Sequence, residues 1–184
     1  MDPRRILPIV FAGEGLLLVA AYAWAWAAEL PLPAGDPIAG LVWGVLAAVL
    51  LAAVNLRLLR LTGNRWPGDS LRHVCRQFVR PLFEHVSAWQ IVVVSLLAGL
   101  AEEMLFRGVL QPLVGLPAAS LIFGAVHVGG RGFVGYGLWA ACIGALFGWL
   151  MVVTGGLLAP IVAHAVYDAL ALAYVRYGPG DLCD

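Results

Sequence analysis

The sequence contains no lysine and few charged residues of any kind. Asp, Glu and Arg make up 12% of its 184 residues, and the formal net charge is zero. Soluble domains carry about 25% charged residues, so this composition excludes an ordinary soluble domain. A neutral chain without lysine also lacks the broad basic surface that nucleic acids require, and we expect no nucleic-acid partner.

Cysteine and catalytic serine patterns are scarce as well. Cys75, Cys142 and Cys183 are an odd number at wide spacings, which favours neither a disulfide framework nor a thiolate metal site. We therefore expect Cys183 to be an incidental tail residue. No serine stands in a GxSxG setting, and Asp168 is the only aspartate within an apolar run, which argues against serine and paired-aspartate intramembrane proteases.

Most residues of the sequence are hydrophobic. They make up 62% of the chain, and the mean hydropathy is +0.91. A helical crossing needs about 20 apolar residues. The sequence has apolar runs at about 6–30, 37–61, 88–115, 117–129, 133–153 and 157–177, separated by Gly and Pro. It predicts an all-α, polytopic integral membrane protein with about six transmembrane helices, in one domain spanning residues 1–184.

We interpret the first run as a retained span, because it is longer than the apolar core of a signal peptide and contains Glu14.

The segment 69–86 has a different pattern. Its apolar residues recur every three or four positions, while Arg72, Arg76 and Arg80 lie on another face. This pattern predicts an amphipathic helix in the membrane interface, capped by Asp69 or Ser70 and bent at Pro81.

The arginines also predict the orientation. With six crossings, every arginine except Arg107 falls on one side of the membrane. Because cytoplasmic loops collect positive residues, we expect both termini to be cytoplasmic.

Seven ionisable residues fall within the apolar runs, where each charge costs about 2.5 to 3.5 kcal/mol to insert. They are Glu14, Glu102, Glu103, Arg107, His127, His164 and Asp168. Glu103 and Arg107 are four residues apart and predict a buried pair. Glu102 is rotated about 100° from that face and has no such cation, which suits a general base. We interpret Glu14, in a Gly-Glu-Gly setting, as a packed residue between helices.

Three of these residues lie at one depth. Glu102, His127 and His164 are each about 12 to 20 Å below the arginine-poor face. His164 and Asp168 are also four residues apart. One carboxylate and two imidazoles could activate water for hydrolysis and stabilise an oxyanion, or they could hold Zn²⁺ with an open position. The spacing leaves both alternatives open, so no metal is certain.

These residues fall within three short motifs: Glu102-Glu103-Met-Leu-Phe-Arg107, Phe123-Gly-Ala-Val-His127 and His164-Ala-Val-Tyr-Asp168. They resemble the EExxxR, FxxxH and HxxxN/D motifs of the CPBP family (CAAX protease and bacteriocin-processing, or Abi), which includes Ras-converting enzyme. The resemblance covers about residues 88–177.

The resemblance implies an intramembrane endopeptidase in which Glu102 activates water, with Glu103 and Arg107 in support. His127 and His164 would bind the water or oxyanion, and Asp168 would orient His164. The small size is similar to bacterial members, so we expect a bacterial inner (plasma) membrane. A secreted peptide, a bacteriocin leader or a sorting signal is then a better candidate substrate than a CAAX protein.

Two other functions compete with this hypothesis. A non-catalytic immunity or scaffold protein would keep the fold, but it has no need of the complete motifs. A haem protein with His127 and His164 as axial ligands would leave Glu102 and Arg107 unexplained. We also expect the pocket to open toward the arginine-rich side, because the 117–129 run is short and ends in Gly-Gly-Arg-Gly.

Overall fold

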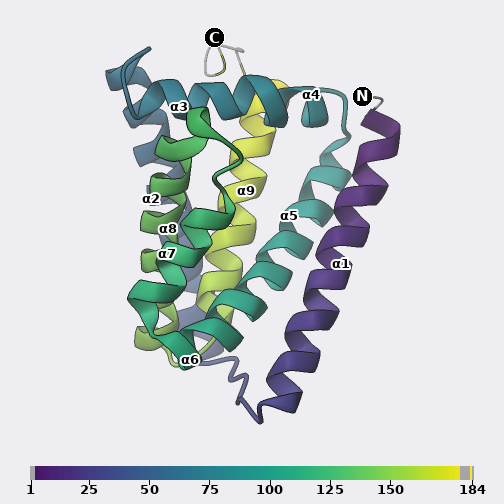
Figure 1. Ribbon diagram of the computed structural model, residues 1–184, viewed down its shortest axis with the longest axis vertical. Coiled ribbons are helices and arrows are strands. Elements are labelled where there is room, and N and C mark those ends of the chain that lie inside the picture. The colour runs from purple at the N-terminus through teal and green to yellow at the C-terminus, as the bar shows by residue number, and fades with distance from the viewer. Residues whose placement is uncertain (1–2, 179–182, 184) are drawn as a thin grey trace.

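A computed structural model describes residues 3–178 and 183 of the protein, and long helices dominate it (Figure 1). They are α1 (Pro3–Ala27), α2 (Pro37–Thr62), α5 (Ala88–Glu103), α8 (Val134–Thr154) and α9 (Leu158–Tyr177). Five segments of the described chain are long and apolar enough to cross a membrane: Leu7–Ala27, Pro37–Thr62, Ala88–Val114, Arg131–Thr154 and Leu158–Tyr177. The prediction of an all-α, polytopic integral membrane protein is confirmed.

The fourth apolar run forms only a short helix. Helix α7 (Leu116–Val126) has 11 residues, or about 17 Å of helix, and falls short of the roughly 30 Å apolar core of a bilayer. Gly115, with a φ of 83°, turns the chain into α7, and the helix ends at His127. The expected six crossings are thus five long spans and one short helix.

The third span changes its winding halfway. Helix α5 continues as a π-helix, η2 (Met104–Leu110), and then as α6 (Gln111–Val114). Arg107 lies within η2, and the π-helical winding still brings its side chain back to Glu103. π-helical segments are rare and often occur at functional sites.

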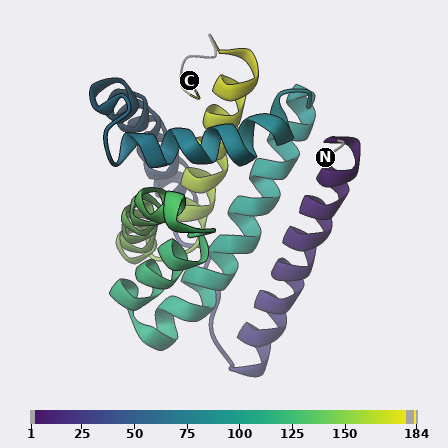
Figure 2. The same ribbon diagram turned by 45° about the horizontal axis from the view of Figure 1, so that its top comes forward.

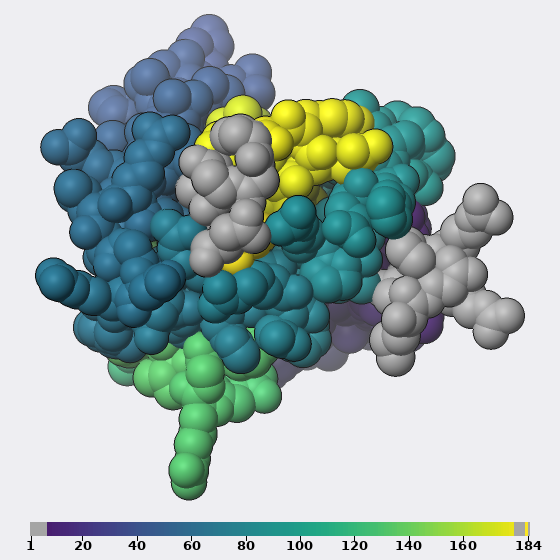
Figure 3. Space-filling view, turned by 90° about the horizontal axis from the view of Figure 1, so that it is seen from above, coloured from purple at the N-terminus to yellow at the C-terminus, as the bar shows by residue number. Residues whose placement is uncertain are grey.

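The segment between the second and third spans lies across one end of the molecule (Figures 1 and 2). This interfacial segment comprises α3 (Gly68–Val74), the π-helix η1 (Cys75–Val79) and α4 (Arg80–Phe83). Seen from above, its atoms reach from the end of α2 toward the start of α5, next to the end of α9 (Figure 3). Leu71 and Val74 are buried and Arg76 is exposed, as expected of an amphipathic helix. Phe78 belongs to the predicted apolar face but is 53% exposed.

The predicted cap of this segment is wrong. The N-cap position is occupied by Pro67, which makes no side-chain hydrogen bond, although Asp69 Oδ1 accepts the Ser70 amide at 2.8 Å within the first turn. Ser70 instead donates its hydroxyl to the Gly132 carbonyl at 2.6 Å and accepts the Tyr136 amide at 3.1 Å. Its side chain therefore ties the interfacial segment to η3 (Arg131–Phe133) and the start of α8.

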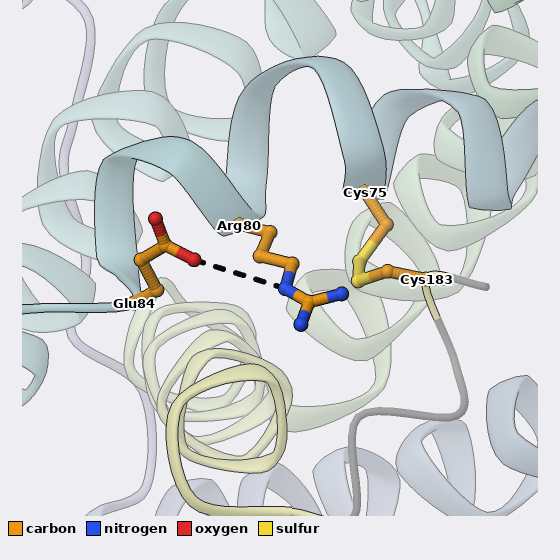
Figure 4. Close-up of a disulfide and its surroundings, with 4 residues drawn as sticks. All are labelled: Cys75, Arg80, Glu84 and Cys183. Atoms are coloured by element: carbon orange, nitrogen blue, oxygen red, sulfur yellow. Dashed lines mark ion pairs between the residues drawn. A yellow bond between two sulfur atoms is a disulfide. The ribbon is translucent and has the colours of Figure 1, made fainter.

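The expectation that the cysteines form no disulfide is also wrong. A disulfide joins Cys75 of η1 to Cys183, 108 residues further along the chain (Figure 4). Arg80 and Glu84 form an ion pair close by, with 3.8 Å between Nε and Oε2. Spacing in the sequence could not reveal this pair, because the fold alone brings the end of α9 beside the interfacial segment.

The start of α1, the end of α9 and the interfacial segment lie at the same end of the molecule (Figure 1). The connections from α1 to α2 and from α8 to α9 lie at the opposite end. This arrangement agrees with the arginine pattern. The assignment of the arginine-rich end to the cytoplasm stays a prediction.

Small residues set the distance between α7 and α8. A Cβ added at Gly124 would lie 2.5 Å from the Gly137 carbonyl oxygen and 2.7 Å from the Cβ of Ala141. The two helices are therefore in backbone contact at this point, as small residues allow in membrane helices. This contact holds α7, and with it His127, against α8.

Gly124→Ala is expected to lower the thermal unfolding temperature in detergent. Overpacking costs about 1–3 kcal/mol, and here a rigid backbone blocks relief, so the loss outweighs the gain in helix propensity of about 1 kcal/mol. Gly13→Ala is the matched control, because a Cβ at Gly13 meets nothing within 4 Å. Equal unfolding temperatures for the two variants would contradict this account of the α7–α8 contact.

The orientation can be tested with single cysteines at the two ends. In a Cys142→Ala background, Arg131→Cys lies at the arginine-rich end and Ala28→Cys at the other; both positions are exposed. A membrane-impermeant thiol reagent should label position 131 only in inside-out vesicles and position 28 only in intact cells. The reverse labelling would place the termini outside the cytoplasm.

Candidate active site

Helices α5, α7 and α9 bring the predicted site residues to one cavity. This cavity has a volume of about 490 Å³ and lies between the helices. Its wall includes, among others, Glu102 from α5, Phe123 and His127 from α7 and its end, and His164 and Asp168 from α9. The residues that the sequence places at one depth therefore share one cavity.

The predicted pair of Glu103 and Arg107 is present and fully enclosed. Arg107 Nη1 donates to Glu103 Oε1 at 2.8 Å, and the side chains are 2% and 0% exposed. Arg107 Nη2 also donates to the Gly144 carbonyl of α8 at 2.9 Å, and its guanidinium lies 4.5 Å from the centre of the Phe123 ring. The pair thus links α5 and η2 to α7 and α8.

Glu103 has a second partner that the sequence analysis missed. His164 Nδ1 donates to Glu103 Oε1 at 2.7 Å, so one carboxylate oxygen accepts from both Arg107 and His164. His164 Nε2 lies 3.5 Å from Asp168 Oδ2. Glu103 and Asp168 therefore hold the His164 ring from its two sides, and the expected proximity of His164 and Asp168 is confirmed.

His127 is oriented by its own helix. Its Nδ1 donates to the Phe123 carbonyl at 2.7 Å, which fixes the proton on Nδ1 in the neutral ring. The Phe123 ring packs against His127, with 4.6 Å between ring centres. The free Nε2 faces Glu102, and it lies 4.0 Å from Oε2.

Glu102 differs from Glu103 in lacking a close partner. Its Oε2 atom is buried and accepts no hydrogen bond from the part of the chain that the structure describes. The 4.0 Å to His127 Nε2 is too long for a direct hydrogen bond. Glu102 and His127 therefore face each other across a gap at the cavity wall.

These residues do not fit a metal site. Among residues 3–178 and 183, no group of three His, Cys, Asp or Glu side chains is placed to hold a metal ion. For a site made of Glu102, His127 and His164, the Nδ1 atom of His164 already donates to Glu103 at 2.7 Å.

The structure corrects the interpretation of Glu14. This residue of α1 lines the cavity instead of only packing between helices, as do Asn55 of α2 and Ser95 of α5. Sequence reasoning passed over Asn55 and Ser95. The sequence does contain an indication of both residues, because a lone amide or hydroxyl in an apolar run needs a hydrogen-bond partner or a function.

The cavity extends from the site residues to the interfacial segment. Leu71, Val74, Cys75, Val79 and Phe83 of that segment line it. The cavity therefore reaches the arginine-rich end of the molecule, the side on which the sequence predicts the opening.

Arg107→Ala is expected to destabilise the protein far more than Glu102→Gln. Removing Arg107 leaves Glu103 buried without its cation, and breaking a buried pair typically costs about 3–5 kcal/mol. Glu102 has no comparable partner to lose. Thermal unfolding in detergent measures both variants, and an equal or smaller loss for Arg107→Ala would contradict the structural role of the pair.

Comparison with known proteins agrees with this site. Residues 84–170 match the family described as type II CAAX prenyl endopeptidase Rce1-like. The uncharacterized protein YpbD of Bacillus subtilis (strain 168) is 38% identical over 98 residues, which is 53% of this chain and 52% of YpbD. The match thus spans about half the length of that relative, and no solved structure matches the chain.

The matched residues contain all three motifs, from Glu102 to Asp168, together with the cavity wall that α5 and α7 build and part of the wall that α9 builds. The family name and the motif geometry therefore point to the same part of the molecule. Residues 84–170 form a domain of the Rce1-like type II CAAX prenyl endopeptidase family.

Proposed function

We propose that this protein is an intramembrane endopeptidase that hydrolyses a peptide bond with water activated by Glu102. The observation that carries the proposal is the gap between Glu102 Oε2 and His127 Nε2. Both residues line the cavity, the two atoms lie 4.0 Å apart, and Glu102 Oε2 is buried without a partner among the described residues. A water molecule that bridges the pair from the cavity side would donate one proton to each atom.

This geometry directs the water. With both of its protons held, the water presents an oxygen lone pair to a carbonyl carbon in the cavity. As the oxygen attacks, Glu102 takes the proton and a tetrahedral oxyanion forms. When the C–N bond breaks, Glu102 passes that proton to the leaving nitrogen, so the carboxylate returns to its starting form.

His164 is the group placed to stabilise the oxyanion. Its Nδ1 donates to Glu103, and two carboxylates face the ring, which favours the imidazolium form. The 3.5 Å from Nε2 to Asp168 is a weak contact, so this N–H is available to a developing oxyanion. Arg107 keeps Glu103 in place and acts through it.

The proposed substrate is a class of peptides. The cavity lies within the membrane-spanning helices and reaches the interfacial segment, so a peptide segment at or in the membrane has access to it. The family name refers to prenylated CAAX proteins. We expect a membrane-associated or secreted peptide instead, cleaved in a bacterial plasma membrane.

Glu102→Gln is expected to abolish cleavage, because glutamine cannot accept the proton from water. A loss of about 10²–10⁴-fold is typical for removal of a general base. Purified protein would be incubated with a defined mixture of synthetic peptides, including a farnesylated CAAX peptide, and new termini identified by mass spectrometry.

Glu29→Gln serves as the matched control, because Glu29 is exposed and lies outside the cavity wall. Cleavage that survives in Glu102→Gln would overturn the role of Glu102. Absence of cleavage by the wild type in any peptide would favour the scaffold function instead.

A further inference from the structure

Helix α1 contributes a carboxylate to the cavity although it lies outside the matched region 84–170. The helix packs along α5 at the side of the bundle (Figure 2). Glu14 faces inward from it, lines the cavity, and interacts electrostatically with Glu102, His164 and Asp168. The mechanism proposed above assigns no role to Glu14.

Several buried polar atoms around the cavity have no hydrogen-bond partner in the described chain. They are Glu14 Oε2, Asn55 Oδ1, Ser95 Oγ and Glu102 Oε2. Ser95 is only 2% exposed and lies on the face of α5 that carries Glu102 seven residues later. Buried polar groups are nearly always hydrogen-bonded. The proposed water accounts for Glu102 Oε2, and the other three atoms around the cavity point to a ligand that supplies their partners.

The unpartnered atoms also define the chemistry of that ligand. Carboxylate and amide oxygens only accept hydrogen bonds, so Glu14 Oε2 and Asn55 Oδ1 both require a donor. A serine hydroxyl also accepts. The ligand group must therefore carry several N–H or O–H donors at one point.

The charge of the cavity wall favours a cationic donor. Glu14, Glu102 and Asp168 line it, and no arginine of the described chain does. Only His127 and His164 oppose these carboxylates. The cavity wall therefore carries more acidic groups than basic ones. A guanidinium offers five donors, no acceptor and a permanent positive charge.

We propose that Glu14, Asn55 and Ser95 form a subsite that binds an arginine side chain of the substrate close to the scissile bond. This arginine subsite rests on the proposed function for the identity of its ligand, a peptide. Glu14 supplies the charge, while the Asn55 amide and the Ser95 hydroxyl supply further acceptors. Asp168 and Glu102 add to the negative field at the end of the subsite nearest the catalytic groups.

The test measures binding without cleavage. The probes are acetylated tripeptide amides of leucine in which arginine or norleucine occupies the first, second or third position. Their dissociation constants with wild-type protein in nanodiscs would be measured by calorimetry, and mass spectrometry would verify that the peptides stay intact. The best arginine peptide should bind at least about tenfold more tightly than its norleucine partner, as expected for charge-assisted hydrogen bonds.

Glu14→Gln should reduce this preference to about threefold or less, while Glu29→Gln, which removes an exposed carboxylate outside the cavity wall, should leave it unchanged. Asn55→Asp adds a carboxylate to the subsite and should increase the preference, so the proposal can be tested even if Glu14→Gln does not fold. Absence of an arginine preference in the wild type, or its survival in Glu14→Gln, would overturn the subsite. Arginine-selective binding by a protein that cleaves no peptide would instead contradict the proposed protease function.

Discussion

A single carboxylate oxygen holds the site together. Glu103 Oε1 accepts hydrogen bonds from Arg107 and from His164, and neither the acid nor the guanidinium is more than 2% exposed. Burying one of these charges alone would cost several kcal/mol, so each depends on the others being in place. Because Arg107 also bonds to the Gly144 carbonyl, the same network fixes α5, α8 and α9 relative to one another.

Glu102 and Glu103 are adjacent in the sequence but have different surroundings. Glu103 accepts from two close donors through Oε1, while its Oε2 has no partner among the described residues. Glu102, one residue earlier and so on another face of the helix, has a buried oxygen without a partner beside the cavity. A carboxylate paired with buried donors stabilises the fold, whereas one without such donors beside a cavity is free to bind water or substrate. The arrangement on α7 follows the same principle, because the Phe123 carbonyl fixes one nitrogen of His127 and leaves the other for the cavity.

The interfacial segment and helix α1 complete the wall of the cavity. The interfacial segment lies across the arginine-rich end and contributes apolar side chains to the cavity. Ser70 ties it to η3 and the start of α8, and the disulfide from Cys75 ties it to Cys183. Helix α1 completes the wall with Glu14. These parts lie wholly or mostly outside residues 84–170, the region that matches the family.

The sequence by itself determined the membrane class, the apolar helices and the buried pair of Glu103 and Arg107. These features depend on composition and on spacing along one helix, which a sequence shows directly. It also placed Glu102, His127 and His164 at one depth, because helical rise converts residue number into distance. Only the tertiary structure decided that His164 bonds to Glu103, that Glu14 lines the cavity and that Cys75 meets Cys183. Each of these contacts joins segments far apart in the chain. Packing decides how a helix is rotated about its axis and which helices are its neighbours. The periodicity of one segment does not encode either of these.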